Sequence, residues 1–160
     1  MTVTDLLERA KALNVMISTA ESCTGGMVAA SLTDIPGSSD VVERGFVTYT
    51  NTAKQEMLGV SAETLAEHGA VSEEVAREMA DGALTHSQAQ LSVSITGIAG
   101  PGGSEFKPEG RVCFGLAVQG HPTRTETVEF GALGRDNVRR AARDHALDLI
   151  SKGLSDIDEK

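Results

Sequence analysis

Side chains that could carry out nucleophilic catalysis occur between residues 39 and 54. Ser39 lies in a Pro-Gly turn, and Tyr49 and Lys54 follow in a predicted strand and at the start of a predicted helix. This order can fold Lys54 back toward Ser39, and a lysine whose pKa is lowered by burial can act as general base to a serine. Tyr49, the single tyrosine, would orient the lysine or relay a proton. Because a lysine is more often a solvated surface charge, spacing alone does not establish this Ser–Lys pair.

A glycine-rich loop follows residues 92–96, whose pattern is typical of a short buried strand. In open α/β sheets ligands bind beyond the carboxyl ends of strands, and glycine lets backbone N–H groups approach them closely. Thr96 and the N–H groups of the loop are therefore candidates for holding an oxyanion. A long connection whose glycines only satisfy turns is the alternative. The glycines concerned are Gly97, Gly100, Gly102 and Gly103.

A second candidate ligand loop lies between a predicted strand at residues 15–19 and a predicted helix at residues 27–34. The first N–H groups of a helix lack partners within the helix, so this arrangement suits an anion. It is not a Walker loop, because no Gly-Lys-Ser/Thr follows, and hydroxyls that only cap the helix explain it equally well. Cys23 is a possible nucleophile there, although an inert buried cysteine is the commoner outcome. The other candidates in this turn are Ser22, Thr24, Gly25 and Gly26.

Composition and spacing exclude several other classes of function. The four histidines are scattered at no metal-ligand spacing, and no G-x-S-x-G elbow is present, so we predict neither a metal nor a Ser-His-Asp triad. A net charge of −9 without a run of Lys or Arg argues against nucleic acid and anionic membranes as partners. The amino terminus lacks the features of a signal peptide, and no apolar run is long enough to span a membrane. We therefore expect a cytoplasmic protein.

The elements that must position these residues first alternate between helix and strand and then form an antiparallel hairpin. This order predicts a three-layer α/β/α fold with a mixed sheet of about five strands. The length suits a single domain over residues 1–160, with an acidic, frayed tail at residues 155–160. The predicted helices are residues 4–13, 27–34, 52–58, 61–68, 72–84 and a last one from 134; the predicted strands are 15–19, 44–50, 92–96, 111–118 and 123–130.

Four segments, in order and at family spacing, resemble the CinA carboxy-terminal domain family. They are TAESCTGG (19–26), PGSSDVVERGFVTYTNTAKQEMLGV (36–60), HGAVSEEVAREMADGAL (68–84) and TGIAGPGG (96–103). The resemblance implies an α/β/α fold and a nicotinamide-nucleotide amidase, which converts nicotinamide mononucleotide to nicotinate mononucleotide and ammonia in pyridine nucleotide recycling. It further implies no metal or other cofactor, and commonly a homo-oligomer. The acidic composition gives no physical support to the links with competence or DNA damage that the family's name suggests.

The resemblance also assigns roles to individual residues. It places the nucleophile on Ser39, the base on Lys54, the tyrosine on Tyr49 and the threonine on Thr96. Arg135, with Arg139 as the alternative, would meet the substrate. Ser22, Thr24, Gly25 and Gly26 would line the same cleft, and the SEFKPEG that follows GPGG departs from the common family pattern.

Two alternatives stay open at this point. A nucleotide-binding regulator of the same fold could keep the glycine-rich loops without catalysis, although such a protein would not need Ser39, Tyr49 and Lys54 together. A related amide or nucleotide is a third possibility, since the fold does not specify the base. If Ser39 is not the nucleophile, Ser22, Cys23 and Thr96 are the next candidates.

Overall fold

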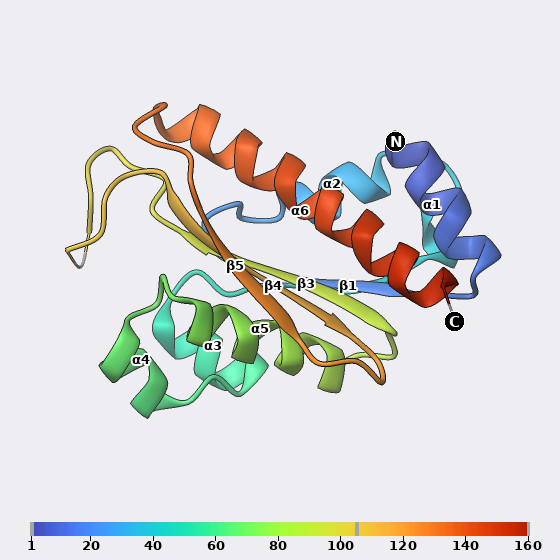
Figure 1. The fold of residues 1–160 in the computed structure, drawn as a ribbon, viewed down its shortest axis with the longest axis horizontal. Helices are drawn as coiled ribbons and strands as arrows, with labels where there is room; N and C mark the ends of the chain where they lie inside the picture. The colour runs from blue at the N-terminus through green and yellow to red at the C-terminus, as the bar shows by residue number, and fades with distance from the viewer. Residues whose placement is uncertain (1, 105, 160) are drawn as a thin grey trace.

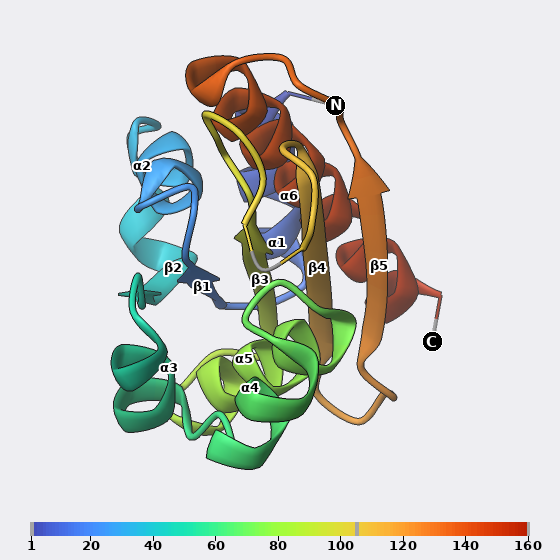
Figure 2. The same cartoon turned by 90° about the vertical axis from the view of Figure 1, so that its left-hand side faces the viewer.

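The computed structural model describes residues 2–104 and 106–159 as one five-stranded sheet between two layers of helices (Figures 1 and 2). The strand order is β2-β1-β3-β4-β5; β1 runs parallel to both β2 and β3, and β4 and β5 are antiparallel to their neighbours. The predicted three-layer fold with a mixed sheet is therefore confirmed. The strands are β1 (Ile17–Glu21), β2 (Val42–Val47), β3 (Leu91–Gly97), β4 (Arg111–Val118) and β5 (Arg124–Glu129).

The helices divide between the two faces of the sheet, with α1, α2 and α6 on one face and α3, α4 and α5 on the other (Figure 1). The hydroxyls of Ser61 and Ser72 cap α4 and α5. Thr50 caps α3 in the same way. The helices are α1 (Val3–Ala12), α2 (Met27–Thr33), α3 (Asn51–Leu58), α4 (Ala62–His68), α5 (Glu73–Thr85) and α6 (Arg135–Asp158), with a short 3-10 helix at Ser38–Asp40.

The central strand β3 shows how the two faces differ. Its apolar residues Leu91, Val93 and Ile95 are buried in the large aliphatic core beneath α1, α2 and α6. The residues between them are hydroxylic and face α5, where Ser94 donates a hydrogen bond to the carbonyl of Ala76 at 2.6 Å. Because alternate residues of a strand point to opposite faces, this single alternation supplies both an apolar core and a polar seam under α5.

The sequence analysis predicted that residues 155–160 fray, but α6 includes residues 155–158, and residue 160 lies outside the described residues. α6 continues to Asp158, because three side-chain contacts hold its end. Arg9 of α1 donates to Ser155 Oγ at 3.1 Å and pairs with Asp158, and Arg124 pairs with Asp156 at 2.7 Å. Among the described residues, no helix has both the length and the apolar character needed to cross a bilayer.

Candidate active site

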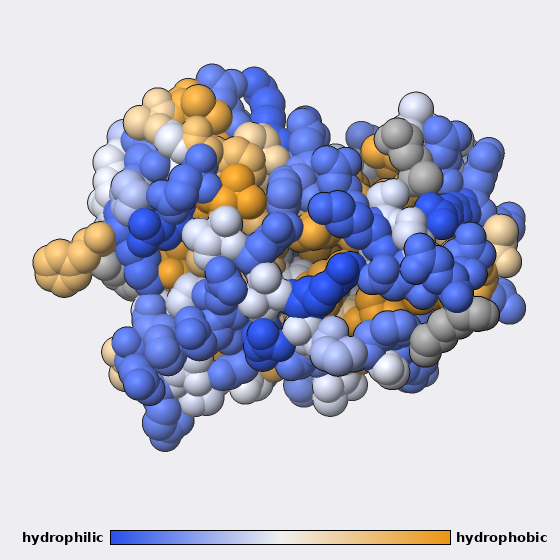
Figure 3. Space-filling view, viewed as in Figure 1, coloured by the Kyte–Doolittle hydropathy of each residue, from blue (hydrophilic) through white to orange (hydrophobic). Residues whose placement is uncertain are grey.

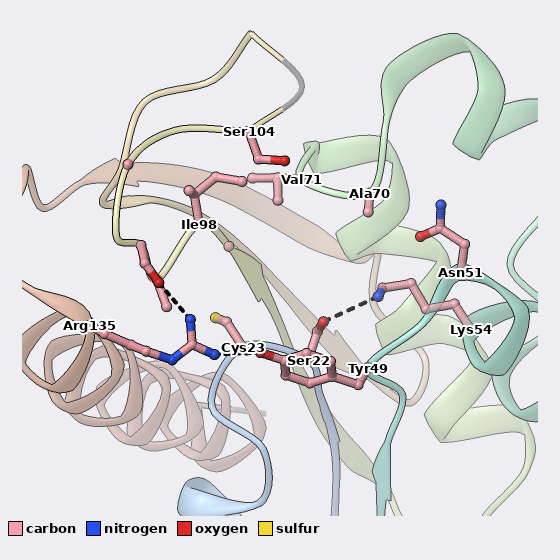
Figure 4. Close-up of a pocket in the computed structure, with 14 residues that line it drawn as sticks. Ser22, Cys23, Tyr49, Asn51, Lys54, Ala70, Val71, Ile98, Ser104 and Arg135 are labelled. Atoms are coloured by element: carbon pink, nitrogen blue, oxygen red, sulfur yellow. Dashed lines mark hydrogen bonds between the residues drawn. The ribbon is translucent and has the colours of Figure 1, made fainter.

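A pocket of about 370 Å³ opens at the carboxyl ends of β1 and β3 (Figure 4). Its volume lies in the range of roughly 300–1,000 Å³ that is typical of small-molecule sites. The turn after β1 forms its floor, the start of α3 forms one side, and the loop from β3 to β4 forms its roof. This is the position at which open α/β sheets bind ligands.

At the floor of the pocket a lysine contacts a serine. Lys54 Nζ lies 3.1 Å from Ser22 Oγ and donates a second hydrogen bond to the carbonyl of Thr48 at 3.0 Å (Figure 4). The side chains are well shielded, since Ser22 is 8% and Lys54 1% exposed. Burial disfavours the charged form of an amine, and a neutral amine at this distance can accept the proton of a serine hydroxyl. The pair therefore has the geometry of a nucleophile and its general base.

The turn that carries Ser22 is held from both sides. The backbone N–H of Ser22 donates to the carbonyl of Ile95 in β3 at 2.9 Å. Glu21, the last residue of β1, is fully buried, and its carboxylate accepts N–H groups from the first turn of α2, including those of Val28 and Ala29 at 3.0 Å each. The N-terminus of α2 is therefore occupied by a carboxylate of the chain itself, so it is not the anion site that the sequence suggested.

Arg139 of α6 also holds the turn that carries Ser22. Its guanidinium donates to the carbonyl of Cys23 at 3.0 Å and to that of Thr24 at 3.4 Å. A Cβ on Gly25 would lie 3.3 Å from Arg139 Nη2, so the small residue leaves room for the guanidinium. Arg139 and Gly25 thus shape the turn and are not among the residues that line the pocket.

Cys23 follows Ser22 and also lines the pocket. Burial, with a smaller contribution from the neighbouring carboxylate of Glu21, raises the pKa of the Cys23 thiol to about 12. A thiol with such a pKa is protonated at neutral pH and is a poor nucleophile. This agrees with the inert role that the sequence analysis ranked higher for Cys23.

Arg135 crosses the mouth of the pocket. From the first position of α6 its guanidinium donates to the carbonyl of Gly100 and to Tyr49 Oη, at 2.6 Å each (Figure 4). Tyr49 was predicted within a strand at residues 44–50, but β2 ends at Val47 because the backbone then leads into the α3 cap. Tyr49 is consequently 57% exposed at the rim, on the opposite side of the mouth from α6.

Residues 2–154, nearly the whole chain, match the CinA C-terminal domain. The chain belongs to the CinA C-terminal domain family. The protein named nicotinamide-nucleotide amidohydrolase PncC, from Escherichia coli strain K12, is 55% identical over 141 residues, which cover 88% of this chain and 85% of that protein. A CinA-like protein of Chlorobium phaeobacteroides strain BS1 is 52% identical over 145 residues, and the chain spans 34% of its length. The crystal structure of the competence/damage inducible protein CihA from Agrobacterium tumefaciens has a TM-score of 0.88 at 46% identity and is covered over 94% of each chain.

In this CinA domain, half of the site residues suggested by the sequence line one pocket. They come from four separate segments, which only the folded sheet brings together. Lys54 and Ser22 lie at the floor, and the others lie at the rim and in the roof. Those that line the pocket are Ser22, Tyr49, Lys54, Gly97, Gly100, Gly102 and Arg135.

The structure does not bring Ser39, the predicted nucleophile, to Lys54. It is exposed in the 3-10 helix Ser38–Asp40, which leads into the amino end of β2, whereas Lys54 follows the carboxyl end of the same strand. The hydroxyl that lies beside Lys54 is that of Ser22. Strand and helix therefore do not fold Lys54 back toward Ser39, because an extended β2 separates them.

Thr96 is also placed differently from the prediction. Its hydroxyl donates to the carbonyl of Ala70 at 2.9 Å and is 1% exposed, so it holds a wall residue instead of facing the pocket. Gly103 does not line the pocket either, and its small size lets the two sides of the loop approach. A Cβ on Gly103 would lie 2.3 Å from the carbonyl oxygen of Lys107. The remaining candidates, Thr24 and Gly26, belong to the turn before α2 and do not line the pocket.

Several lining residues were not predicted. Asn51 follows the cap of α3 and lies near Lys54 at the side of the pocket (Figure 4); the sequence analysis did not propose it as a site residue. The rest are small or aliphatic and carry no chemical signal in the sequence. Among the described residues, no group of three or more His, Cys, Asp or Glu side chains could hold a metal ion. The unpredicted lining residues are Asn51, Ala70, Val71, Ile98, Ala99 and Ser104.

Proposed function

We propose that this chain is a nicotinamide-nucleotide amidohydrolase, which converts nicotinamide mononucleotide and water to nicotinate mononucleotide and ammonia. One observation carries the proposal: a buried lysine contacts a serine hydroxyl at 3.1 Å on the floor of a pocket open to a small molecule. The name of the Escherichia coli relative, at 55% identity, supports the substrate. We assign the nucleophile to Ser22 and the general base to Lys54.

In the first half-reaction, Lys54 Nζ accepts the proton of Ser22 as Oγ attacks the carbonyl carbon of the carboxamide. The resulting tetrahedral intermediate carries a negative oxygen. Backbone N–H groups at the floor of the pocket would stabilise this oxygen by hydrogen bonds. The N–H group of Cys23, directly after the nucleophile, is the first candidate. Lys54 then protonates the departing nitrogen, the C–N bond breaks, and ammonia leaves an acyl ester on Ser22.

The second half-reaction repeats these steps with water. Lys54 accepts a proton from the water, the hydroxide adds to the ester carbonyl, and the carbon–Oγ bond breaks. The proton on Lys54 returns to Ser22, and nicotinate mononucleotide is released. The substrate phosphate suits Arg135 at the mouth of the pocket, because a guanidinium is always charged and binds phosphate oxygens in pairs.

The test is ammonia release from nicotinamide mononucleotide by the purified, EDTA-treated protein, with Lys54→Ala and Ser22→Ala measured alongside. We expect turnover by the wild type that survives chelation and is lost in both variants. Tight binding of the mononucleotide without turnover would instead indicate a nucleotide-binding regulator. Homo-oligomerisation and a cytoplasmic location stay predictions; sedimentation equilibrium and cell fractionation test them.

A further inference from the structure

The roof of the pocket is tied to the start of α6 by one carboxylate. Glu109, just before β4, accepts the backbone N–H of Gly102 at 2.8 Å with one oxygen and that of Gly134 at 3.1 Å with the other. Gly102 belongs to the roof loop, and Gly134 is the cap residue directly before Arg135. A single side chain therefore joins the loop over the pocket to the helix that carries the arginine.

The roof loop has room for this carboxylate because residue 100 is a glycine. A Cβ on Gly100 would lie 2.6 Å from Glu109 Cδ, and its φ of +91° lies in the region that favours glycine. The carbonyl of the same Gly100 accepts the hydrogen bond from Arg135 Nη1 at 2.6 Å. The contacts thus form a closed ring, from Glu109 through the loop to the guanidinium and back through the helix cap.

The other end of the roof is held independently. Lys107 Nζ donates to the carbonyls of His68 and Val71, at 2.7 and 2.5 Å, and so fastens the roof to the segment between α4 and α5. Both acceptors of Lys107 lie outside α6, whereas Glu109 bonds to the residue that caps α6. Loss of Glu109 should therefore release the Arg135 side of the roof while Lys107 keeps the opposite side in place.

We propose that Glu109 is a positioning residue, which sets the place of Arg135 at the mouth of the pocket and thereby the affinity for the phosphate of the substrate. This inference rests on the proposed function and adds a specificity role to it. The physical reason is that a paired guanidinium–phosphate contact depends on the direction of both N–H groups, which a displaced backbone alters. Ser22 and Lys54 lie on other elements, so the chemical step should not depend on Glu109.

The experiment compares nicotinamide mononucleotide with nicotinamide riboside, which presents the same amide without the phosphate. For Glu109→Ala we expect KM for the mononucleotide to rise about tenfold, with kcat and the riboside kinetics unchanged. Glu109→Gln, which keeps one acceptor oxygen, should lie between this variant and the wild type. Glu129→Gln, which removes the charge of an exposed carboxylate bonded to Arg111, is the matched control and should behave as wild type.

A double-mutant cycle shows whether Glu109 acts through the arginine. We expect Glu109→Ala combined with Arg135→Ala to be no worse than Arg135→Ala alone, because both remove the same phosphate contact. Additive losses, or an equal fall of kcat on both substrates, would overturn the proposal. If the wild type turns over the mononucleotide but Glu109→Ala leaves KM unchanged, this inference is wrong. The proposed function is not affected by that result.

A readout without turnover separates the two proposals further. If the wild type binds the mononucleotide without releasing ammonia, the proposed function is wrong, and the Kd from calorimetry replaces KM in the same comparison. Amide exchange at Gly102 and Gly134 should also accelerate in Glu109→Ala and not in Glu129→Gln. Unchanged exchange, or a wild type that neither binds nor turns over the mononucleotide, overturns the role proposed for Glu109.

Discussion

Two short turns of this chain carry a serine among small residues, and the fold places only the serine of the first turn beside Lys54. The turn with Ser22 leaves the carboxyl end of β1, and the turn with Ser39 enters the amino end of β2. Because β1 and β2 are parallel, the two turns lie at opposite ends of the sheet. The six residues of β2, at about 3.3 Å each, span roughly 20 Å. Strand direction, and not closeness in the chain, therefore decides which serine can meet Lys54.

Exchange of the two hydroxyls tests this comparison most directly. Ser22→Ala should lower kcat for nicotinamide mononucleotide by about 10³-fold or more, because it removes the proposed nucleophile. Ser39→Ala, at an exposed position, should retain activity within about twofold. Ammonia release by both variants is the measurement. The reverse result, an active Ser22→Ala and an inactive Ser39→Ala, would return the nucleophile to the turn before β2.

The second prediction concerns the buried amine. Lys54→Met keeps an unbranched side chain of similar length but cannot accept a proton, so kcat should fall by about 10²–10⁴-fold. The carbonyl of Thr48 loses a hydrogen bond, which should lower the free energy of unfolding by about 1–3 kcal/mol. Initial rates and denaturant titration measure the two effects. A folded Lys54→Met with wild-type turnover would contradict the role of Lys54 as base.

The third prediction sharpens the contrast between the floor and the mouth of the pocket. Arg135→Ala should raise KM for the mononucleotide by about 10–100-fold through loss of charged hydrogen bonds, with a smaller effect on kcat. Arg140→Ala, on an exposed residue of the same helix, is the control and should leave KM unchanged. A fall of kcat with constant KM would show that Arg135 acts in the chemical step rather than in binding.

The smallest effect is expected at Cys23, the neighbour of Ser22. With its pKa raised to about 12 by burial, the Cys23 thiol is almost entirely protonated at pH 8.5, whereas a thiol of ordinary pKa is substantially ionised at that pH. Iodoacetamide at pH 8.5 should therefore leave Cys23 of the folded protein unmodified and activity intact. As the pH rises toward 12 the thiolate forms, and alkylation should accelerate. Rapid modification at pH 8.5, measured by mass spectrometry, would contradict a buried neutral thiol.

Local patterns predicted the elements well, because the signals that define them are short-range. The alternation in residues 92–96 lies within β3, and the predicted helices that start near Ser61 and Ser72 are capped by these residues. The misassigned elements depended on distant contacts. The end of α6 is ordered through Arg9 of α1, which a frayed-tail prediction from composition cannot include.

The chemistry of the site divides in the same way. The residue types are present in the sequence: a serine and a lysine for acyl transfer, a guanidinium for phosphate, and glycines for a tight roof. Their assignment to partners required the tertiary structure, since Ser22 and Lys54 are 32 residues apart and meet only because β2 lies beside β1 in parallel. The same packing places the carboxylates of Glu21 and Glu109 at the starts of α2 and α6. There they accept backbone N–H groups that a bound anion would otherwise use. A hydrogen bond depends on position to within a fraction of an ångström, and strand order and register specify that position where residue type does not.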